Sequence, residues 1–246
     1  MPYRYFESQI LVEKDKYSAL KTYWHNLVQL YEEWYDGNTE VFGRAPPLNH
    51  EKVTIGNKRE NAILTWWKLR EDKYLKKYRL KKEVFRGKTI LDIGPGGIPY
   101  GLIFERAEVI NVDPLLSYYQ KLGFPFQYYD KRARYFKGHA EQLPLPDNSI
   151  DVILSLNVDH FDDFQTTVNE MRRVGKTGCL IRLLISYHRP SILEPLQLND
   201  KMVFNAFTWC PNFKKIEEHH IENSEIGEYG ETVCLWTNFN QEGELF

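Results

Sequence analysis

The chain has 246 residues, which suits one α/β domain with an extension or two small domains. Its net charge of −2 gives no general attraction to nucleic acid, and its three widely spaced cysteines offer neither a disulfide framework nor metal-type pairs. The N-terminus lacks the features of a signal peptide, and no apolar run approaches the ~18 residues of a membrane span. We therefore expect a cytoplasmic protein without a membrane span.

The first third of the chain, residues 1–85, is aromatic and charged and is expected to form a helical N-terminal extension. Apolar residues at helical spacing predict a helix over 14–34, and residues 36–57 are interpreted as a loop. Asn61 is expected to cap a second helix that continues through Tyr78. Two roles stay open for this extension, namely packing alone or a lid over the ligand site, because the second helix leads straight into the first strand.

A basic stretch lies at residues 68–88, where ten Lys or Arg residues stand against three acids. One interpretation is a solvated helix face, and the other is a patch that contacts the phosphates of RNA or of a nucleotide-linked substrate. Tyr74 and Tyr78 interleave with the charges at helical spacing, so they can pack inward while the lysine stems reach water. A nucleic-acid partner is therefore not expected.

Strand and helix signals alternate from residue 86 to residue 246, which predicts a Rossmann-like α/β domain with a mainly parallel sheet and helices on both faces. Seven strands are expected, over 89–93, 108–112, a short segment before Gly138, 150–156, 179–186, 215–221 and 232–237. Helices are expected over 99–106, 114–122, 161–174 and 193–207.

A glycine turn, Gly94-Pro95-Gly96-Gly97, follows the first of these strands. Glycines let the backbone turn sharply and approach a ligand without a Cβ in the way, and Pro99 suits the first turn of a following helix. Asp113 ends the next apolar run, at a spacing from which a carboxylate can accept both hydroxyls of an adenosine ribose. Pro99 stands where the dinucleotide fingerprint needs its third glycine, so the signal at this point is for a nucleoside in general.

Two later motifs make the signal more specific. The stretch from Gly138 to Asp151, Gly-His-Ala-Glu-Gln-Leu-Pro-Leu-Pro-Asp-Asn-Ser-Ile-Asp, is followed by a strand that ends in Asn-Val-Asp-His160. Together with Asn169-Glu-Met-Arg-Arg-Val-Gly-Lys-Thr-Gly178, it resembles the class I S-adenosylmethionine-dependent methyltransferases. The best match is to the subgroup that includes quinone C-methyltransferases and many small-molecule methyltransferases, and it covers residues 87–240.

The resemblance implies S-adenosylmethionine as the cofactor and gives roles to individual positions. The residues that would surround its methionine part are Asp92, Gly94, Gly96 and Gly97, with Asn157 beside the amino group and the transferred methyl. Asp113 would hold the ribose, and the adenine would be flanked by His139, Ala140 and Glu141. The chain departs from the family at Ile98, where a third glycine is usual, and at His139, where an acid is usual.

Residues near the acceptor are expected at the same sheet edge. His160 follows the strand at 150–156, and a histidine there suits proton removal from a hydroxyl acceptor, although packing before the next helix is the alternative. Tyr187, His188 and Arg189 follow the next strand and are candidates for substrate binding. The adjacent His219 and His220 would point to opposite faces of a strand, so no metal site is expected.

These features predict an S-adenosylmethionine-dependent methyltransferase that methylates O or N of a small or carrier-linked molecule. The sulfonium is already an activated methyl donor, so the protein mainly has to align the acceptor and exclude water. Two alternatives stay open. One is an RNA or protein methyltransferase that uses the basic stretch 68–88, and the other is a catalytically inactive cofactor-binding regulatory protein.

Overall fold

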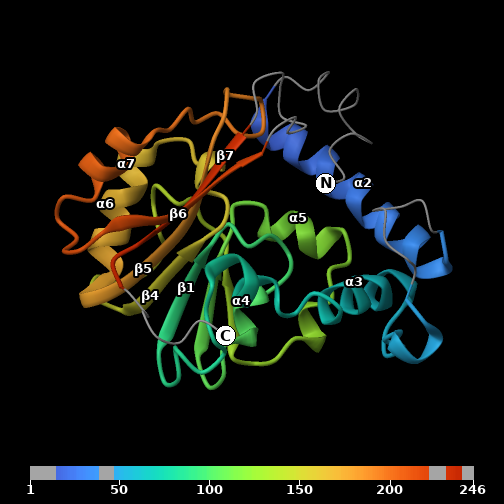
Figure 1. The fold of residues 1–246 in the computed structure, drawn as a ribbon. Coiled ribbons are helices and arrows are strands. Elements are labelled where there is room, and N and C mark those ends of the chain that lie inside the picture. The colour runs from blue at the N-terminus through green and yellow to red at the C-terminus, as the bar shows by residue number, and fades with distance from the viewer. Residues whose placement is uncertain (1–14, 39–46, 222–230, 240–246) are drawn as a thin grey trace. The chain divides into compact units, whose positions relative to one another are not determined.

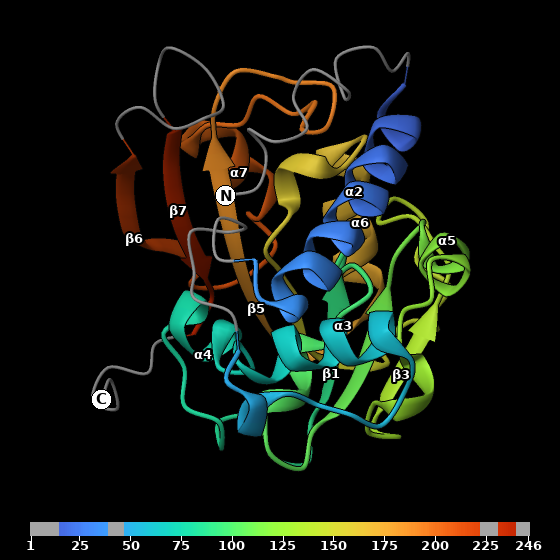
Figure 2. The same cartoon turned by 90° about the vertical axis from the view of Figure 1, so that its right-hand side faces the viewer.

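The computed structural model describes residues 15–38, 47–221 and 231–239 (Figures 1 and 2). The described chain divides into two compact units. The first contains the residues up to Glu71 together with Leu115–Tyr129, and the second contains Asp72–Pro114 and the residues from Asp130 onward. The domain boundary expected at residue 85, and the lid that the extension would form, stay predictions.

A seven-stranded sheet forms the framework of the second unit, in the order β3-β2-β1-β4-β5-β7-β6 (Figure 1). Its strands are β1 Thr89–Ile93, β2 Glu108–Val112, β3 Ala133–Phe136, β4 Ile150–Ser155, β5 Gly175–Tyr187, β6 Lys214–Ile221 and β7 Glu231–Thr237. The first five pair in parallel, and β7 runs antiparallel to both β5 and β6. This confirms the expected mainly parallel sheet, with β5 starting four residues earlier than its apolar run.

The burial of the strands follows from their sequences. Strands β1, β2 and β4 are almost continuously buried, as expected of parallel strands that are covered on both faces. Strand β6 lies at the edge of the sheet and is mostly exposed, with charged residues along it. The carboxyl ends of β1, β2 and β4 therefore meet in the buried middle of the sheet, where open α/β sheets place their ligands.

Helices of the second unit lie on both faces of this sheet. On one face, Val168 and Met171 of α6 (Phe164–Val174) and Val203 of α7 (Asp200–Ala206) belong to the main apolar cluster together with Ile93 and Ile153. The other face carries α4 (Lys73–Tyr78) and the 3-10 helix η4 (Tyr100–Ile103), whose Tyr74 and Tyr100 rings have centroids 5.6 Å apart. A further 3-10 helix, η6 (Val158–His160), follows β4.

The helix expected over 99–106 is wrong, because this connection forms only the four-residue η4. Gly101 packs so tightly on β2 that a Cβ there would lie 2.9 Å from Cγ1 of Val109. Arg106 then takes a left-handed conformation with φ of 54° just before β2. A longer helix does not fit between this close packing and the start of the strand.

The first unit is helical, as expected, and contains α2 (Lys16–Asp36), α3 (Lys58–Lys68) and α5 (Leu116–Lys121), with the 3-10 helices η3 (Asn49–Glu51) and η5 (Phe126–Tyr128). Helices α2 and α3 meet through aromatic rings, and the centroid of Trp66 lies 5.2 Å from Tyr31 and 5.3 Å from Trp34. Residues 39–46 of the loop expected over 36–57 lie outside the described residues. None of the helices in the described part of the chain has the length and apolar composition that a bilayer crossing requires.

The expected cap at Asn61 is wrong, and Asn57 caps α3 instead. The Asn57 side chain accepts from the backbone N–H of Glu60, and the Glu60 carboxylate accepts from the backbone N–H of Asn57. Asn61 lies inside the helix, where its side chain accepts from the backbone N–H groups of Ile55 and Gly56. The reciprocal pair satisfies two amides at the helix start, which a residue four positions later cannot do.

The basic stretch 68–88 does not form one helical face. Helix α3 ends at Lys68, and α4 ends at Tyr78, where Arg79 takes a left-handed conformation. Arg79 pairs with Glu217 at 2.7 Å, and Lys82 pairs with Glu105 at 2.8 Å. Part of the positive charge is thus neutralised within the second unit.

The close packing of Gly101 predicts a cost for any side chain there. Gly101→Ala should lower the free energy of unfolding by about 1–3 kcal/mol, because the new methyl overpacks the contact with Val109. Denaturant titration measures the change. Val109→Ala in the same chain should relieve the clash, so the double variant should lose less stability than the two single variants together. Strict additivity would contradict this reading of the contact.

Candidate active site

The glycine turn stands at the carboxyl end of β1. Gly94 and Gly96 have φ of 72° and 74°, in the left-handed region that side chains rarely adopt. The N–H of Gly94 donates to the carbonyl of Val112 at 2.9 Å, which fixes the turn beside the end of β2. The turn therefore places backbone without side chains where the strand ends converge.

Two polar side chains from neighbouring strand ends hold this turn. The N–H of Gly96 donates to Oδ2 of Asp113 at 3.1 Å, and Asp113 follows β2 directly. Asn157, just after β4, donates from Nδ2 to the carbonyl of Gly94 at 2.6 Å. Three segments that are far apart in the sequence thus meet at a single turn.

Asp92 lies under the turn as a fully buried carboxylate. The Tyr74 hydroxyl of α4 donates to its Oδ2 at 2.7 Å, whereas Oδ1 has no hydrogen-bond partner among the described residues. Burial raises the pKa of Asp92 to about 7, although the bond from Tyr74 lowers it. The sequence marked Tyr74 only as an inward-facing residue at helical spacing, and nothing in it pointed to this contact.

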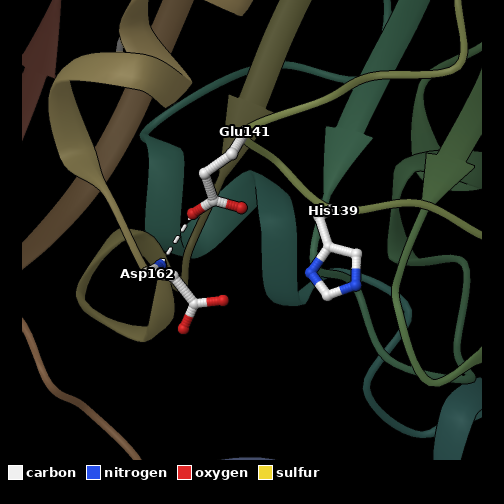
Figure 3. A group of neighbouring side chains, drawn as sticks. All are labelled: His139, Glu141 and Asp162. Atoms are coloured by element: carbon white, nitrogen blue, oxygen red, sulfur yellow. Dashed lines mark hydrogen bonds between the residues drawn. The ribbon is translucent and has the colours of Figure 1, made fainter.

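The segment assigned to the adenine, residues 139–141, lies at the same edge (Figure 3). Ala140 is buried, and His139 is exposed. Oε1 of Glu141 accepts from the backbone N–H groups of Asp162 and Asp163 at 2.7 and 3.1 Å. Figure 3 shows that the side chains of His139 and Asp162 extend into the same space. Glu141 therefore anchors the loop that leads into α6.

A second polar group follows β4 and β5. His188 is buried, and its Nε2 lies 3.2 Å from Oδ2 of Asp159, while its Nδ1 lies 2.6 Å from the carbonyl of Arg189. Burial alone would lower the pKa of His188, but these hydrogen bonds and the nearby Glu194 outweigh it and raise the pKa to about 9. His160 also joins this group, because its Nε2 lies 3.4 Å from Oε1 of Glu194.

The three residues expected to bind substrate do not share one exposed face. The Tyr187 hydroxyl donates to Asp200 at 2.9 Å and accepts from Nε1 of Trp236 at 3.1 Å, His188 is buried, and Arg189 is exposed. Their substrate-binding role stays a prediction, and Arg189 is the most accessible of them. Sequence reasoning missed Asp159 and Glu194, because no motif links two acids that stand 35 residues apart.

Residues 91–183 match the family described as Methyltransferase domain. The demethylmenaquinone methyltransferase of Geobacillus kaustophilus is 28% identical over 144 residues, which cover 52% of this chain and 57% of that protein. Residues 91–183 therefore carry a methyltransferase domain, and these similarities support the expected class I S-adenosylmethionine-dependent family. The chain spans little more than half the length of this curated relative.

Solved structures with similar folds have low sequence identity to the methyltransferase domain. An arsenic(III) S-adenosylmethionine methyltransferase from Chlamydomonas reinhardtii is 19% identical with a TM-score of 0.49, and the match covers 67% of this chain and 68% of that one. A putative methyltransferase from Bacillus halodurans is 15% identical with a TM-score of 0.49, and the match covers 68% and 97%.

The cofactor of such a domain is S-adenosylmethionine, and the residues at the glycine turn fit it. The molecule carries a positively charged amino group, and Asp92 offers a buried carboxylate oxygen without a described partner. Its ribose carries two hydroxyls, and Asp113 offers a nearly buried carboxylate beside the turn. The left-handed glycines provide the bare backbone between them.

Replacement of Asp113 tests the ribose assignment. Asp113→Ala should weaken S-adenosylmethionine binding by about 1.5–3 kcal/mol, or roughly 10- to 150-fold, because a charged acceptor is lost. Isothermal titration calorimetry measures the change. Glu108→Ala, at the exposed start of the strand that Asp113 follows, is the matched control and should bind the cofactor normally. Equal affinity of the folded Asp113→Ala variant and the wild type would rule out the assignment.

The burial of Asp92 predicts that its negative charge lowers the stability of the fold and strengthens cofactor binding. Its pKa rises from 3.8 to about 7 on folding, so the unfolded chain ionises first and the fold loses stability as the pH rises through this window. Asp92→Asn should therefore stabilise the cofactor-free protein at pH 8, by at most about 4 kcal/mol, and weaken cofactor binding. Thermal unfolding and calorimetry report the two effects.

Asp151→Asn is the control for that experiment. The pKa of Asp151 is lowered because hydrogen bonds from the Thr89 N–H and Lys176 outweigh its partial burial, so loss of its charge should not stabilise the fold at pH 8. A loss of stability for Asp92→Asn at pH 8 would contradict the burial argument.

Proposed function

We propose that the chain is an enzyme that transfers the methyl group of S-adenosylmethionine to an O or N atom of a small or carrier-linked molecule. The observation that carries this proposal is the convergence of Asp113 and Asn157 on the turn at Gly94–Gly96, above the buried carboxylate of Asp92. Each contact comes from a different strand end, so the sheet fixes their mutual positions before any ligand binds.

In this proposal each residue has a physical task. Asp92 and Asn157 hold the amino acid part of the cofactor, Asp113 accepts from the ribose hydroxyls, and His139, Ala140 and Glu141 flank the adenine. The bound cofactor supplies an activated methyl group on a sulfonium. The protein aligns the acceptor with the S–CH3 bond and keeps water away, which are the main requirements of this chemistry.

His160 is proposed as the proton acceptor when the acceptor group is a hydroxyl. It ends η6 directly after β4, and its side chain is only partly exposed. Oε1 of Glu194 lies 3.4 Å from its Nε2, so the carboxylate can orient the ring. Arg189, exposed after β5, is the residue proposed to contact an anionic part of the acceptor.

The acceptor can be identified by comparing product formation across a panel of molecules of different chemistry. The relative from Geobacillus kaustophilus is named for demethylmenaquinone, so a reduced quinone belongs in the acceptor panel with a phenol, an amine and an RNA. An RNA or protein acceptor is the weaker candidate, because Arg79 and Lys82 of the basic stretch already pair with acids. Cofactor binding without product for any acceptor would favour the regulatory alternative.

Replacement of His160 tests its role. His160→Ala should lower turnover of a hydroxyl acceptor by roughly 10²–10⁴-fold and leave the affinity for S-adenosylmethionine unchanged, because a base acts in the transition state. Formation of S-adenosylhomocysteine under saturating substrate measures the effect. His220→Ala, on the exposed edge strand β6, is the control and should keep full turnover. Normal turnover of a hydroxyl acceptor by His160→Ala would exclude the base role.

A further inference from the structure

Three buried side chains beyond the glycine turn form a compact group. Asp159 comes from η6 after β4, and His188 and Glu194 come from the segment after β5. Nε2 of His188 lies 3.2 Å from Oδ2 of Asp159 and 3.7 Å from Oε2 of Glu194. The His188 side chain is fully buried, and both carboxylate side chains are 7% exposed.

The orientation of His188 suits a metal ligand. Its Nδ1 lies 2.6 Å from the backbone carbonyl of Arg189, so Nδ1 carries a proton and donates it to that carbonyl. Histidines that bind metals are commonly held in this way, with the other ring nitrogen hydrogen-bonded to a carbonyl or carboxylate. The remaining nitrogen, Nε2, points at the two carboxylates.

The charge of the group also needs compensation. Two carboxylates that are removed from water lose most of their hydration, and such groups are found paired or bound to a metal. A proton on His188 balances one of the two negative charges, and Nε2 of His160 lies 3.4 Å from Oε1 of Glu194. A divalent cation balances both and leaves the imidazole neutral, as metal binding requires.

We propose that Asp159, His188 and Glu194 bind a Zn²⁺ ion. Zn–N and Zn–O bonds of about 2.0–2.2 Å place neighbouring ligand atoms of a tetrahedral site about 3.3–3.6 Å apart. The two measured distances, 3.2 and 3.7 Å, bracket this range. His160 lies outside the ligand set and contacts the other oxygen of Glu194, which orients that carboxylate.

The other two groups with metal-ligand side chains fit less well. Two members of the group His139, Glu141 and Asp162 are exposed, and Glu141 already accepts from two backbone amides. In the group of Asp200, Glu218 and Cys234, the ammonium of Lys215 pairs with both carboxylates.

The ion would tie the segment after β5 to the turn after β4, next to Asn157. This role is independent of methyl transfer, so the test needs neither the cofactor nor an acceptor. The full chain is stripped of metal with a chelator, and Zn²⁺ binding is followed by calorimetry and by elemental analysis. We expect one tightly bound Zn²⁺ per chain with Kd below about 1 µM, unaffected by millimolar Mg²⁺, and a rise of several degrees in Tm.

Three variants locate the ion. Glu194→Gln keeps the shape of the side chain and should weaken Zn²⁺ binding by at least about 100-fold, because loss of an outer-shell partner alone costs about 10- to 100-fold. His139→Ala and Cys234→Ser remove one ligand from each of the other groups and should bind Zn²⁺ normally. Co²⁺ in the site should show visible ligand-field bands without a thiolate charge-transfer band, since the proposed ligands are N and O.

Any of the following results would overturn the proposal. Absence of tight Zn²⁺ binding by the wild-type chain would mean that the cluster is balanced without a metal ion, whether or not Glu194→Gln folds. Loss of binding in His139→Ala or Cys234→Ser, or a thiolate band with Co²⁺, would place the ion in another group. Unchanged binding by a folded Glu194→Gln variant would exclude these ligands.

Discussion

The burial of Asp92 under the glycine turn is the constraint on which the rest of the site depends. A carboxylate without water is stable only with compensation, and here the Tyr74 hydroxyl supplies one hydrogen bond while Oδ1 has no partner among the described residues. The strand order places this group in the middle of the sheet, between β2 and β4. The fold thus maintains an unfavourable charge at the site where a cationic ligand fits.

The ends of the neighbouring strands fix the positions of the residues around Asp92. Because β1, β2 and β4 are parallel and adjacent, the residues that follow each of them lie at one edge. Asp113 and Asn157 both hold the glycine turn from such positions. Positioning by strand ends is more rigid than positioning by a loop alone, since the backbone of each strand is fixed by its ladder of hydrogen bonds.

Much of this arrangement is predictable from the sequence, and the remainder has identifiable physical reasons. The seven strands follow from apolar runs, motif spacing places Asp113 at the end of the second strand, and the family resemblance places Asn157 at the same sheet edge. The helix expected over 99–106 was wrong because close packing of Gly101 against Val109 is a tertiary effect. Asn57 caps α3 in place of the predicted Asn61, because Asn57 and Glu60 form reciprocal hydrogen bonds at the start of the helix. The contacts of Tyr74 with Asp92, and of His188 with Asp159, join distant residues that no local pattern connects.

The Glu141 carboxylate has a consequence for the order of events in a catalytic cycle. It stands in the segment assigned to the adenine, and it accepts from the backbone N–H groups of Asp162 and Asp163, two and three residues after His160. A ligand that packs against residues 139–141 therefore acts on the same hydrogen-bonded loop to which we assign the acceptor side. Such a linkage favours a compulsory kinetic order, in which the nucleoside is seated first and the acceptor meets a loop that is already rigid.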